Sequence, residues 1–279
     1  ITALHKSYLV LQPNLQRIYS MIVGILKMIL YLEHFGIILS WLIFLLLFEF
    51  NSSNIQIINI KNRMIKNIFL GTIVKFILPI YFLFIVHMIS KHYLYIQSNS
   101  YLIILLDLFI LDLYLYCFHI ISHNNSILWK FHEIHHLDEK LDATTELRIH
   151  FGEPILAFFL KLPIIFFLAI PLKIYILYEI ILTIIGTLHH SNICVPMKID
   201  KLINKIITMP NMHSVHHHAI TKDTNSNYGF VFSFWDAIFK TKSNSIRQDN
   251  WKFGLRYAAE KPLIKLLYYP FTSKKLKNL

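Results

Sequence analysis

Long apolar segments alternate with short polar ones along most of the chain. Residues 35–50 (FGIILSWLIFLLLFEF) form a nearly uncharged run of about one membrane thickness, which ends at the polar NSSN of 51–54. Two further apolar runs, 68–90 and 101–118, have the same character. Each of these three runs predicts a membrane-spanning helix.

Two other apolar segments fit a simple span less well. Residues 18–32 carry Lys27 near their middle, which favours an interfacial helix or a poor span. Residues 155–188 are apolar but are broken by Pro163 and Pro171 and interrupted by three charged residues, so they predict a helical hairpin that does not fully cross the bilayer. The pattern predicts an all-α, multi-pass membrane protein with about four membrane-embedded helices and a cytoplasmic histidine-rich cap.

Composition narrows the class of protein further. The 279 residues are 55% hydrophobic and 15% charged, with a mean hydropathy of +0.50, which excludes an ordinary water-soluble enzyme. Seven Gly and nine Pro are too few for a disordered or collagen-like chain. Cys117 and Cys194 are far apart with no CxxC motif, so we expect neither a disulfide framework nor a thiolate metal site.

The net charge of +11 is uneven, and it predicts an orientation. Residues 189–279 hold fourteen Lys and Arg but five Asp and Glu, which favours an anionic lipid surface as partner and not nucleic acid. The loop 51–67 holds three Lys and Arg against one in 91–100, so 51–67 is expected on the cytoplasmic side. Following the spans from there places the segments after His119 and after the hairpin on that same side.

These patterns divide the chain into three parts. Residues 1–34 are predicted to be an N-terminal interfacial or poor transmembrane segment, residues 35–245 the membrane domain, and residues 246–279 a basic, peripheral C-terminal tail.

Histidines carry the unusual chemistry of the sequence. Twelve of the 16 lie between His119 and His218. They form an HxxxH pair at 119–123 and two HxxHH clusters at 132–136 and 213–217, spacings that place imidazoles on one face of a helix. A lone histidine is ordinarily a surface or hydrogen-bonded core residue. Three clusters at ligand spacing, each beside an apolar span, instead indicate two metal ions.

We expect the clusters to converge, because neither the first pair nor the second cluster has enough donors to complete its own ion. His5, His34, His87 and His92 are not expected to be ligands, and imidazoles alone leave iron, zinc and copper open. Glu133 and Asp138 are candidates to hold ligand rings in place. The predicted metal ligands are His119, His123, His132, His135, His136, His190, His213, His216 and His217, and the further candidates as ligands or supporting groups are His150, His189, His218 and Asp112.

This series of boxes resembles the fatty acid hydroxylase and sterol desaturase superfamily of membrane di-iron oxidoreductases, in its bacterial-type sterol desaturase branch. The resemblance covers about 35–245. Two positions depart from the pattern: Ile120 stands where Arg is frequent, and Lys240 where Gly is usual. The residues that carry the resemblance outside the boxes are Asp112, Tyr114, 128–131, Thr145, Arg148, His150, Glu153, 190–192, Pro210, 227–229, Trp235, Asp236 and Phe239.

The resemblance implies an enzyme that hydroxylates or desaturates a C–H bond of a lipid, such as a sterol or fatty acyl chain. It implies two iron ions, for which zinc can substitute in preparations, and O2 as co-substrate. The chain shows no GxGxxG and no haem-binding motif, so electrons are expected from a separate cytochrome b5-like or ferredoxin-like donor. The alternatives are a metal-handling or metal-transport membrane protein and a non-oxygenase member of the fold.

Overall fold

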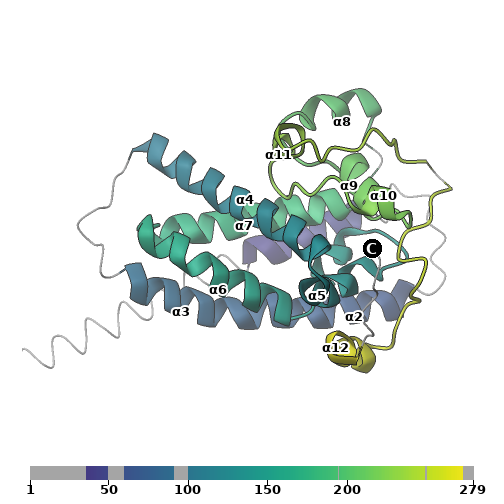
Figure 1. Cartoon of the computed structure of the whole chain (residues 1–279), viewed down its shortest axis with the longest axis horizontal. Helices are drawn as coiled ribbons and strands as arrows, with labels where there is room; N and C mark the ends of the chain where they lie inside the picture. The colour runs from purple at the N-terminus through teal and green to yellow at the C-terminus, as the bar shows by residue number, and fades with distance from the viewer. Residues whose placement is uncertain (1–35, 50–59, 91–99, 194, 249, 273–279) are drawn as a thin grey trace, which may run out of the picture. The chain divides into compact units, whose positions relative to one another are not determined.

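The computed structural model describes residues 36–49, 60–90, 100–193, 195–248 and 250–272. The expectations for 1–34, and with them His5 and His34, lie outside the described residues, as does His92. The chain forms two compact units, Ile1–Trp41 and Leu42–Leu279, and every labelled element belongs to the second. Within the described residues the regular structure is helical, with isolated β-bridges but no extended sheet, so the predicted all-α class is confirmed (Figure 1).

Among the described residues, three helices are long and apolar enough to cross a membrane. The first joins α2 (Ile60–Thr72), the π-helical turn η1 (Ile73–Ile77) and α3 (Leu78–Ser90) into one rod. The other two are α4 (Tyr101–Asn124) and α7 (Leu172–His190). The spans expected at 68–90 and 101–118 are therefore present. Both helices are longer than the predicted spans, since the first begins at Ile60 and α4 continues through the first histidine pair, whose HxxxH spacing already predicted a helix.

The predicted span at 35–50 is described in part. Among the described residues the apolar helix there covers Gly36–Glu49, and its role as a span stays a prediction. The Glu49 carboxylate accepts hydrogen bonds from the backbone N–H groups of Ala143 and Asn192. This acidic residue is 5% exposed, so it lies in the protein interior.

The expected hairpin consists of α6 (Gly152–Phe167) and α7. Pro163 does not break α6, contrary to expectation, and lies inside the helix. The turn after α6 is closed by hydrogen bonds from Ala169 N to Phe166 O and from Ile170 N to Ile165 O, the pattern of a Schellman motif. Lys161 of α6 and Glu179 of α7 form an ion pair at 3.1 Å, which explains how the hairpin keeps two charges among apolar residues.

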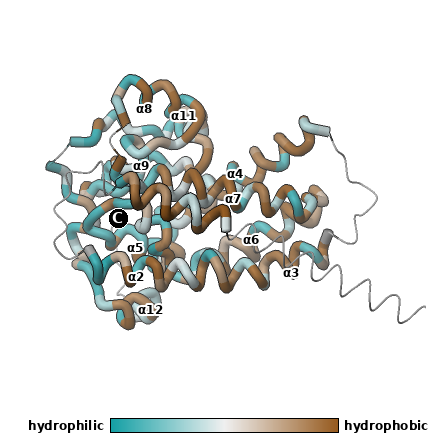
Figure 2. The backbone as a smooth tube through the Cα atoms, turned by 180° about the vertical axis from the view of Figure 1, so that it is seen from behind, coloured by the Kyte–Doolittle hydropathy of each residue, from teal (hydrophilic) through white to brown (hydrophobic). Residues whose placement is uncertain are grey.

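The core lies between α3, α4, α6 and α7, which run alongside one another in Figure 1. Its buried members include Val86, Leu111, Phe158 and Tyr178, one from each of these helices. The outward faces of the same helices are also apolar, as the brown segments of Figure 2 show, and large side chains such as Phe84 and Leu102 are exposed on them. Apolar residues on both faces are typical of helices that lie in lipid.

Shorter helices follow the long ones and gather at one end of this bundle, where hydrophilic residues are frequent (Figure 2). Buried Leu266 of the last helix packs with Ile134 and Leu137, so the described part of the predicted C-terminal tail lies against the second histidine cluster. These shorter elements are α5 (Ser126–His136), η3 (Ala143–Leu147), α8 (Met197–Ile203), α9 (Pro210–His216), α10 (Thr221–Thr224), α11 (Phe234–Ile238) and α12 (Leu263–Thr272).

The turn between α6 and α7 gives a testable prediction. Ala169 adopts φ 53°, a left-handed conformation that costs a residue with a Cβ about 1 kcal/mol relative to glycine. We expect Ala169→Gly to raise the stability of the purified protein by up to about 1 kcal/mol. Thermal unfolding in detergent measures this, and a lower melting temperature would contradict the described turn.

Candidate metal centre

The first two histidine clusters are placed by a sharp break between α4 and α5. The side chain of Asn125 ends α4 and caps α5 by accepting hydrogen bonds from Ile127 N and Leu128 N. Asn125 itself has an extended backbone (φ −104°, ψ 118°), so the chain changes direction at this residue. This turn lays the rings of His119 and His123 against that of His132, with ring centroids 4.7 and 4.8 Å apart.

The third cluster reaches the same place through α9. Pro210 occupies the first turn of this helix, where its missing N–H costs nothing. Asp112 of α4 accepts hydrogen bonds from Val231 N, Phe232 N and the Trp235 indole at the start of α11. The residues before α9 are joined to the same segment by the hydrogen bond from Thr208 N to Val231 O. His190 ends α7, which packs directly against α9.

The convergence expected from the sequence is present. The nine histidines predicted as ligands lie together and all are buried. Helices α5 and α9 each supply rings to both groups, so the two groups adjoin. Within each group the candidate ligand nitrogens lie within 4.8 Å of one another: His119, His123, His132, His136 and His216 form the first group, and His135, His190, His213 and His217 form the second.

The ring nitrogens approach one another as ligands of a cation do. In the first group, Nε2 of His132 lies 3.0 Å from Nε2 of His119 and 3.1 Å from Nε2 of His136. In the second, Nε2 of His190 lies 3.0 Å from Nε2 of both His135 and His213. Two nitrogens bound at about 2.1 Å and at right angles around one metal are about 3.0 Å apart.

Several of the opposite ring nitrogens are oriented by acceptors, although Nδ1 of His135, His213 and His217 has no hydrogen-bond partner among the described residues. Nδ1 of His119 donates to Tyr228 O at 2.8 Å, and Nδ1 of His216 donates to Ser226 O at 2.7 Å. A carbonyl oxygen can only accept, so the proton is on Nδ1 and the Nε2 lone pair is left for the group. Nε2 of His216 and of His123 have no hydrogen-bond partner in the described part of the chain. The residues present therefore fit metal ions.

The protonation of these rings also suits metal binding. Burial, and then the proximity of His132, lower the pKa of His216 to about 3. Burial likewise lowers the pKa of His135, His136 and His217 well below the ordinary value, with neighbouring histidines adding to the effect. Neutral imidazole is the form that binds a metal, so these rings are ready to bind at neutral pH.

Two carboxylates flank the groups. Glu153 accepts a hydrogen bond from Nδ1 of His132 at 2.8 Å. Glu146 lies 3.3 Å from Nδ1 of His190, whose hydrogen is directed to Gly186 O, and it is paired with Lys75 of the long first helix at 2.7 Å. Carboxylates in these positions fix the orientation of ligand rings and offset the charge of a bound cation.

Two of the further candidates turn away from both groups. His150 uses both ring nitrogens elsewhere, since Nε2 donates to Leu267 O and Nδ1 accepts from Gly152 N. His218 stacks on Trp251 at 3.8 Å and pairs with Asp223. Neither residue occupies a histidine position of the HxxxH pair or of the two HxxHH clusters.

Of the remaining candidates, His189 lies beside the second group, whereas the three acidic residues have other partners. Buried His189 forms a third set with Glu146 and His190, beside the second group. Asp112 contacts no histidine among the described residues and acts on the loop before α11 instead. Glu133 and Asp138 are likewise directed elsewhere: Glu133 accepts from Tyr269 of α12, and Asp138 accepts from Arg63, Asn67 and Thr145.

Sequence reasoning missed the Lys75–Glu146 pair. A lysine in the middle of an apolar span is itself a signal, because such a charge requires a buried partner. Glu146 reaches its place because α7 has glycine at 186: a Cβ there would lie 2.7 Å from the Glu146 carboxyl carbon. No property of the local sequence links these positions, which are far apart along the chain.

Comparison with known proteins agrees with this geometry. Residues 104–241 match the fatty acid hydroxylase family model. The chain is 28% identical to ornithine lipid hydroxylase OlsE of Rhizobium tropici over 176 residues, covering 63% of the chain and 52% of the relative. It is 24% identical to alkylglycerol monooxygenase of Danio rerio over 168 residues, covering 57% and 35%, and 27% identical to that of Homo sapiens over 133 residues, covering 45% and 27%. No solved structure gives a significant match.

The fold and the site thus define a helical membrane protein with a histidine-lined metal centre. The part of the chain that holds this centre belongs to the fatty acid hydroxylase family, and the resemblance inferred from the boxes is confirmed. The chain spans about half the length of the first of these curated relatives and about a third or less of the others.

One ligand from each group provides a test of the site. We expect His213→Ala and His216→Ala to weaken metal binding by more than about 100-fold, since each removes a nitrogen ligand and not merely an outer hydrogen-bond partner. Elemental analysis of the purified full chain during chelator competition measures this. His150→Ala and His218→Ala are matched controls that should keep their metal. Equal loss in controls and ligand variants would contradict the grouping.

Gly186 provides a second test. We expect Gly186→Ala to displace Glu146 and the adjoining His190, which should lower both metal content and stability, the latter by about 1–3 kcal/mol. Gly36→Ala is the control, because a Cβ at Gly36 meets no atom within 4 Å. Full metal content in Gly186→Ala would show that the close approach is dispensable.

Proposed function

We propose that the protein is an O2-dependent membrane oxidoreductase that hydroxylates a lipid, with two iron ions held by the nine histidines. The observation that carries the proposal is the pair of adjoining, buried all-imidazole groups at one end of a bundle of apolar helices. Family membership supports lipid oxidation generally. Iron, in place of zinc or copper, is the proposed metal.

The two histidine groups and the residues around them have different roles in the proposed site. The first group would hold one ion and the second group the other, while Glu153 and the carbonyl of Tyr228 keep ligand rings in orientation. Bound iron supplies O2 reduction and C–H oxidation, chemistry that side chains alone do not supply. Burial of the groups excludes water from the reacting lipid.

Hydroxylation is favoured over desaturation. The relatives' names describe a lipid hydroxylase and a monooxygenase, and these names concern an ornithine lipid and alkylglycerols. They support an amphiphilic lipid with a polar headgroup as the substrate of this chain more than a sterol. Lateral entry from the bilayer, between the apolar helices, suits such a substrate.

Electrons are proposed to come from a separate donor protein of the cytochrome b5-like or ferredoxin-like kind. The histidine groups are proposed to face the cytoplasm, where such donors are found. The charge bias of the loops and the basic 189–279 segment support this orientation.

Metal transport is the competing function, and the ionisable residues in the spans argue against it. Transport needs polar residues available along a path through the bilayer. Lys75 is instead paired with Glu146, and Lys161 with Glu179.

An isotope experiment tests the proposed activity. The full chain is reconstituted with iron in membranes of a lipid extract and given a ferredoxin-type reductant and ¹⁸O2. We expect a lipid product with one added ¹⁸O atom, and we expect none from His136→Ala, while His218→Ala keeps product formation.

Three results would contradict the proposal. The first is a product that has lost two hydrogens without gaining oxygen, which would indicate desaturation. The second is oxygen derived from water. The third is metal uptake into proteoliposomes without lipid oxidation, which would favour transport.

A further inference from the structure

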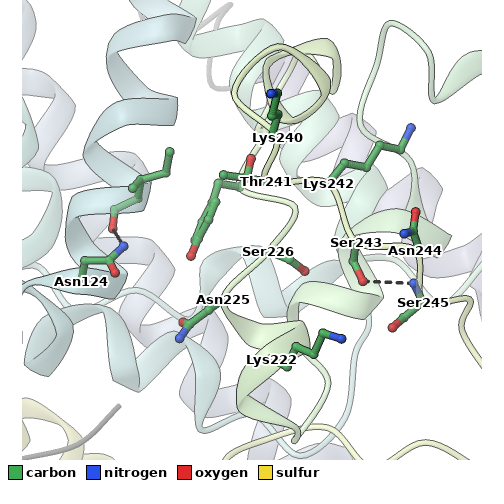
Figure 3. A pocket seen from close by; sticks show the side chains of 12 residues that line it. Asn124, Lys222, Asn225, Ser226, Lys240, Thr241, Lys242, Ser243, Asn244 and Ser245 are labelled. Carbon is green, nitrogen blue, oxygen red and sulfur yellow. Dashed lines mark hydrogen bonds between the residues drawn. The ribbon is translucent and has the colours of Figure 1, made fainter.

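A hollow of about 600 Å³ opens beside the first histidine group, within the size range of small-molecule sites. It lies between the end of α4, α10 and the segment that follows α11. Figure 3 shows Lys240, Lys242 and Lys222 at different points around it, with the Lys240 and Lys242 side chains extending outward, and Asn124 and Asn225 on another side. Ile120 and Lys240, where the sequence departs from the family pattern, both line it.

Three residues that line this pocket, Asn225, Ser226 and Tyr228, also contact histidines of the first group. The Asn225 side-chain oxygen lies 3.2 Å from Nδ1 of His123. The backbone carbonyls of Ser226 and Tyr228 accept from His216 and His119. The pocket is therefore one layer of residues away from the first histidine group.

The charge of the lining is positive and is not balanced within it. Three lysines line the pocket, together with amides and hydroxyls, and no acidic residue does. Two buried acids near the pocket already have hydrogen-bond partners. Asp223 binds His218 and Ser245. Asp236 accepts hydrogen bonds from Tyr228 N and Gly229 N, and burial raises its pKa against the smaller, lowering effect of the positive charge of Lys242. A concave site of this kind fits an anionic group.

Lys240 occupies its position at a conformational cost. Its φ of 59° lies in the left-handed region, where glycine is favoured and a lysine costs about 1 kcal/mol. Residues with such strain cluster at functional sites, although Ala169 has the same conformation in an ordinary helix-ending turn. An ammonium group at the rim of an anion site would be one such function for Lys240.

The surroundings of the pocket indicate that the anion is part of a lipid. Ile238 and Phe239 immediately precede Lys240 and are 59% and 50% exposed. Asp112 ties the start of this segment to α4, a membrane-spanning candidate. Exposed apolar residues followed by lysines are typical of the level where the hydrocarbon layer meets the headgroups.

We propose that this pocket binds the anionic headgroup of the lipid substrate, through a phosphate or carboxylate group attracted by the exposed lysines around it, Lys222, Lys240 and Lys242. The proposal rests on the proposed function for the statement that the bound lipid is the substrate. It limits the substrate class to lipids with a negatively charged headgroup.

Lipid binding without turnover tests the pocket separately from the chemistry. The full chain is placed in nanodiscs of phosphatidylcholine with a minor fraction of either phosphatidylglycerol or diacylglycerol, and the lipids retained after extraction are identified by native mass spectrometry. The variants are Lys240→Gly, which suits the backbone at that position, and the double variant Lys240→Gly with Lys242→Gln. Lys198→Gln, an exposed lysine outside the pocket, is the matched control.

We expect wild type to retain phosphatidylglycerol preferentially. Lys240→Gly should reduce this preference about fivefold and the double variant by more, while the control keeps it. Lys240→Gly should not lower the melting temperature, and metal content should not change in any variant. A reduction of this size in folded, metal-containing protein would support the pocket.

Other results would overturn the proposal. They are equal retention of phosphatidylglycerol and diacylglycerol by wild type, or an equal loss of preference in Lys198→Gln and Lys240→Gly. Competition by millimolar inorganic phosphate as effective as that by phosphatidylglycerol would overturn the lipid assignment, since the pocket would then take free anions. No O2 or reductant is present, so a failure of hydroxylation leaves these outcomes interpretable.

Discussion

Imidazole nitrogens that face one another across 3.0–3.2 Å need a proton or a cation between them, because two bare lone pairs repel; the described residues hold six such approaches between Nε2 atoms. A bound cation would meet this need in both groups at once. Without protons or metal, the groups cost free energy that the rest of the fold must supply. Many polar contacts around the centre hold the rings in place, although Nδ1 of His135, His213 and His217 has no hydrogen-bond partner among the described residues.

The supporting layer is built from charges that come from distant parts of the chain. Lys75 reaches Glu146, and Arg63 reaches Asp138, so the long first helix fixes the η3 region behind the second group. Arg148 is buried there, donates to Ile134 O and pairs with Glu260, which connects the C-terminal segment to the helix that bears the second cluster. Buried pairs of this kind are costly to break, so each of them restricts how far the ligand helices can shift.

The histidine groups lie at the end of the bundle, between the apolar long helices and the polar short ones. The long helices present apolar side chains outward, as lipid-facing helices do, whereas the short helices carry the polar groups (Figure 2). A lipid whose chain lies along the bundle has its headgroup at the level of the short helices. The lysine-lined pocket beside His123 lies among those short helices, and Asn225 both lines it and contacts Nδ1 of His123.

The sequence by itself determined the helical membrane class, the hairpin and the nine histidines that the structure brings together, because apolar runs and i, i+3, i+4 spacings are local properties of a chain. It did not determine the division into two groups, in which α5 and α9 each serve both, nor the departure of His150 and His218. The continuation of α6 through Pro163 was likewise not predicted. Glu146, Glu153 and Gly186 acquire their roles only through contacts with residues far along the chain. Such contacts are decided by how helices pack, and packing depends on the shape and charge of surfaces that are assembled only when the chain folds.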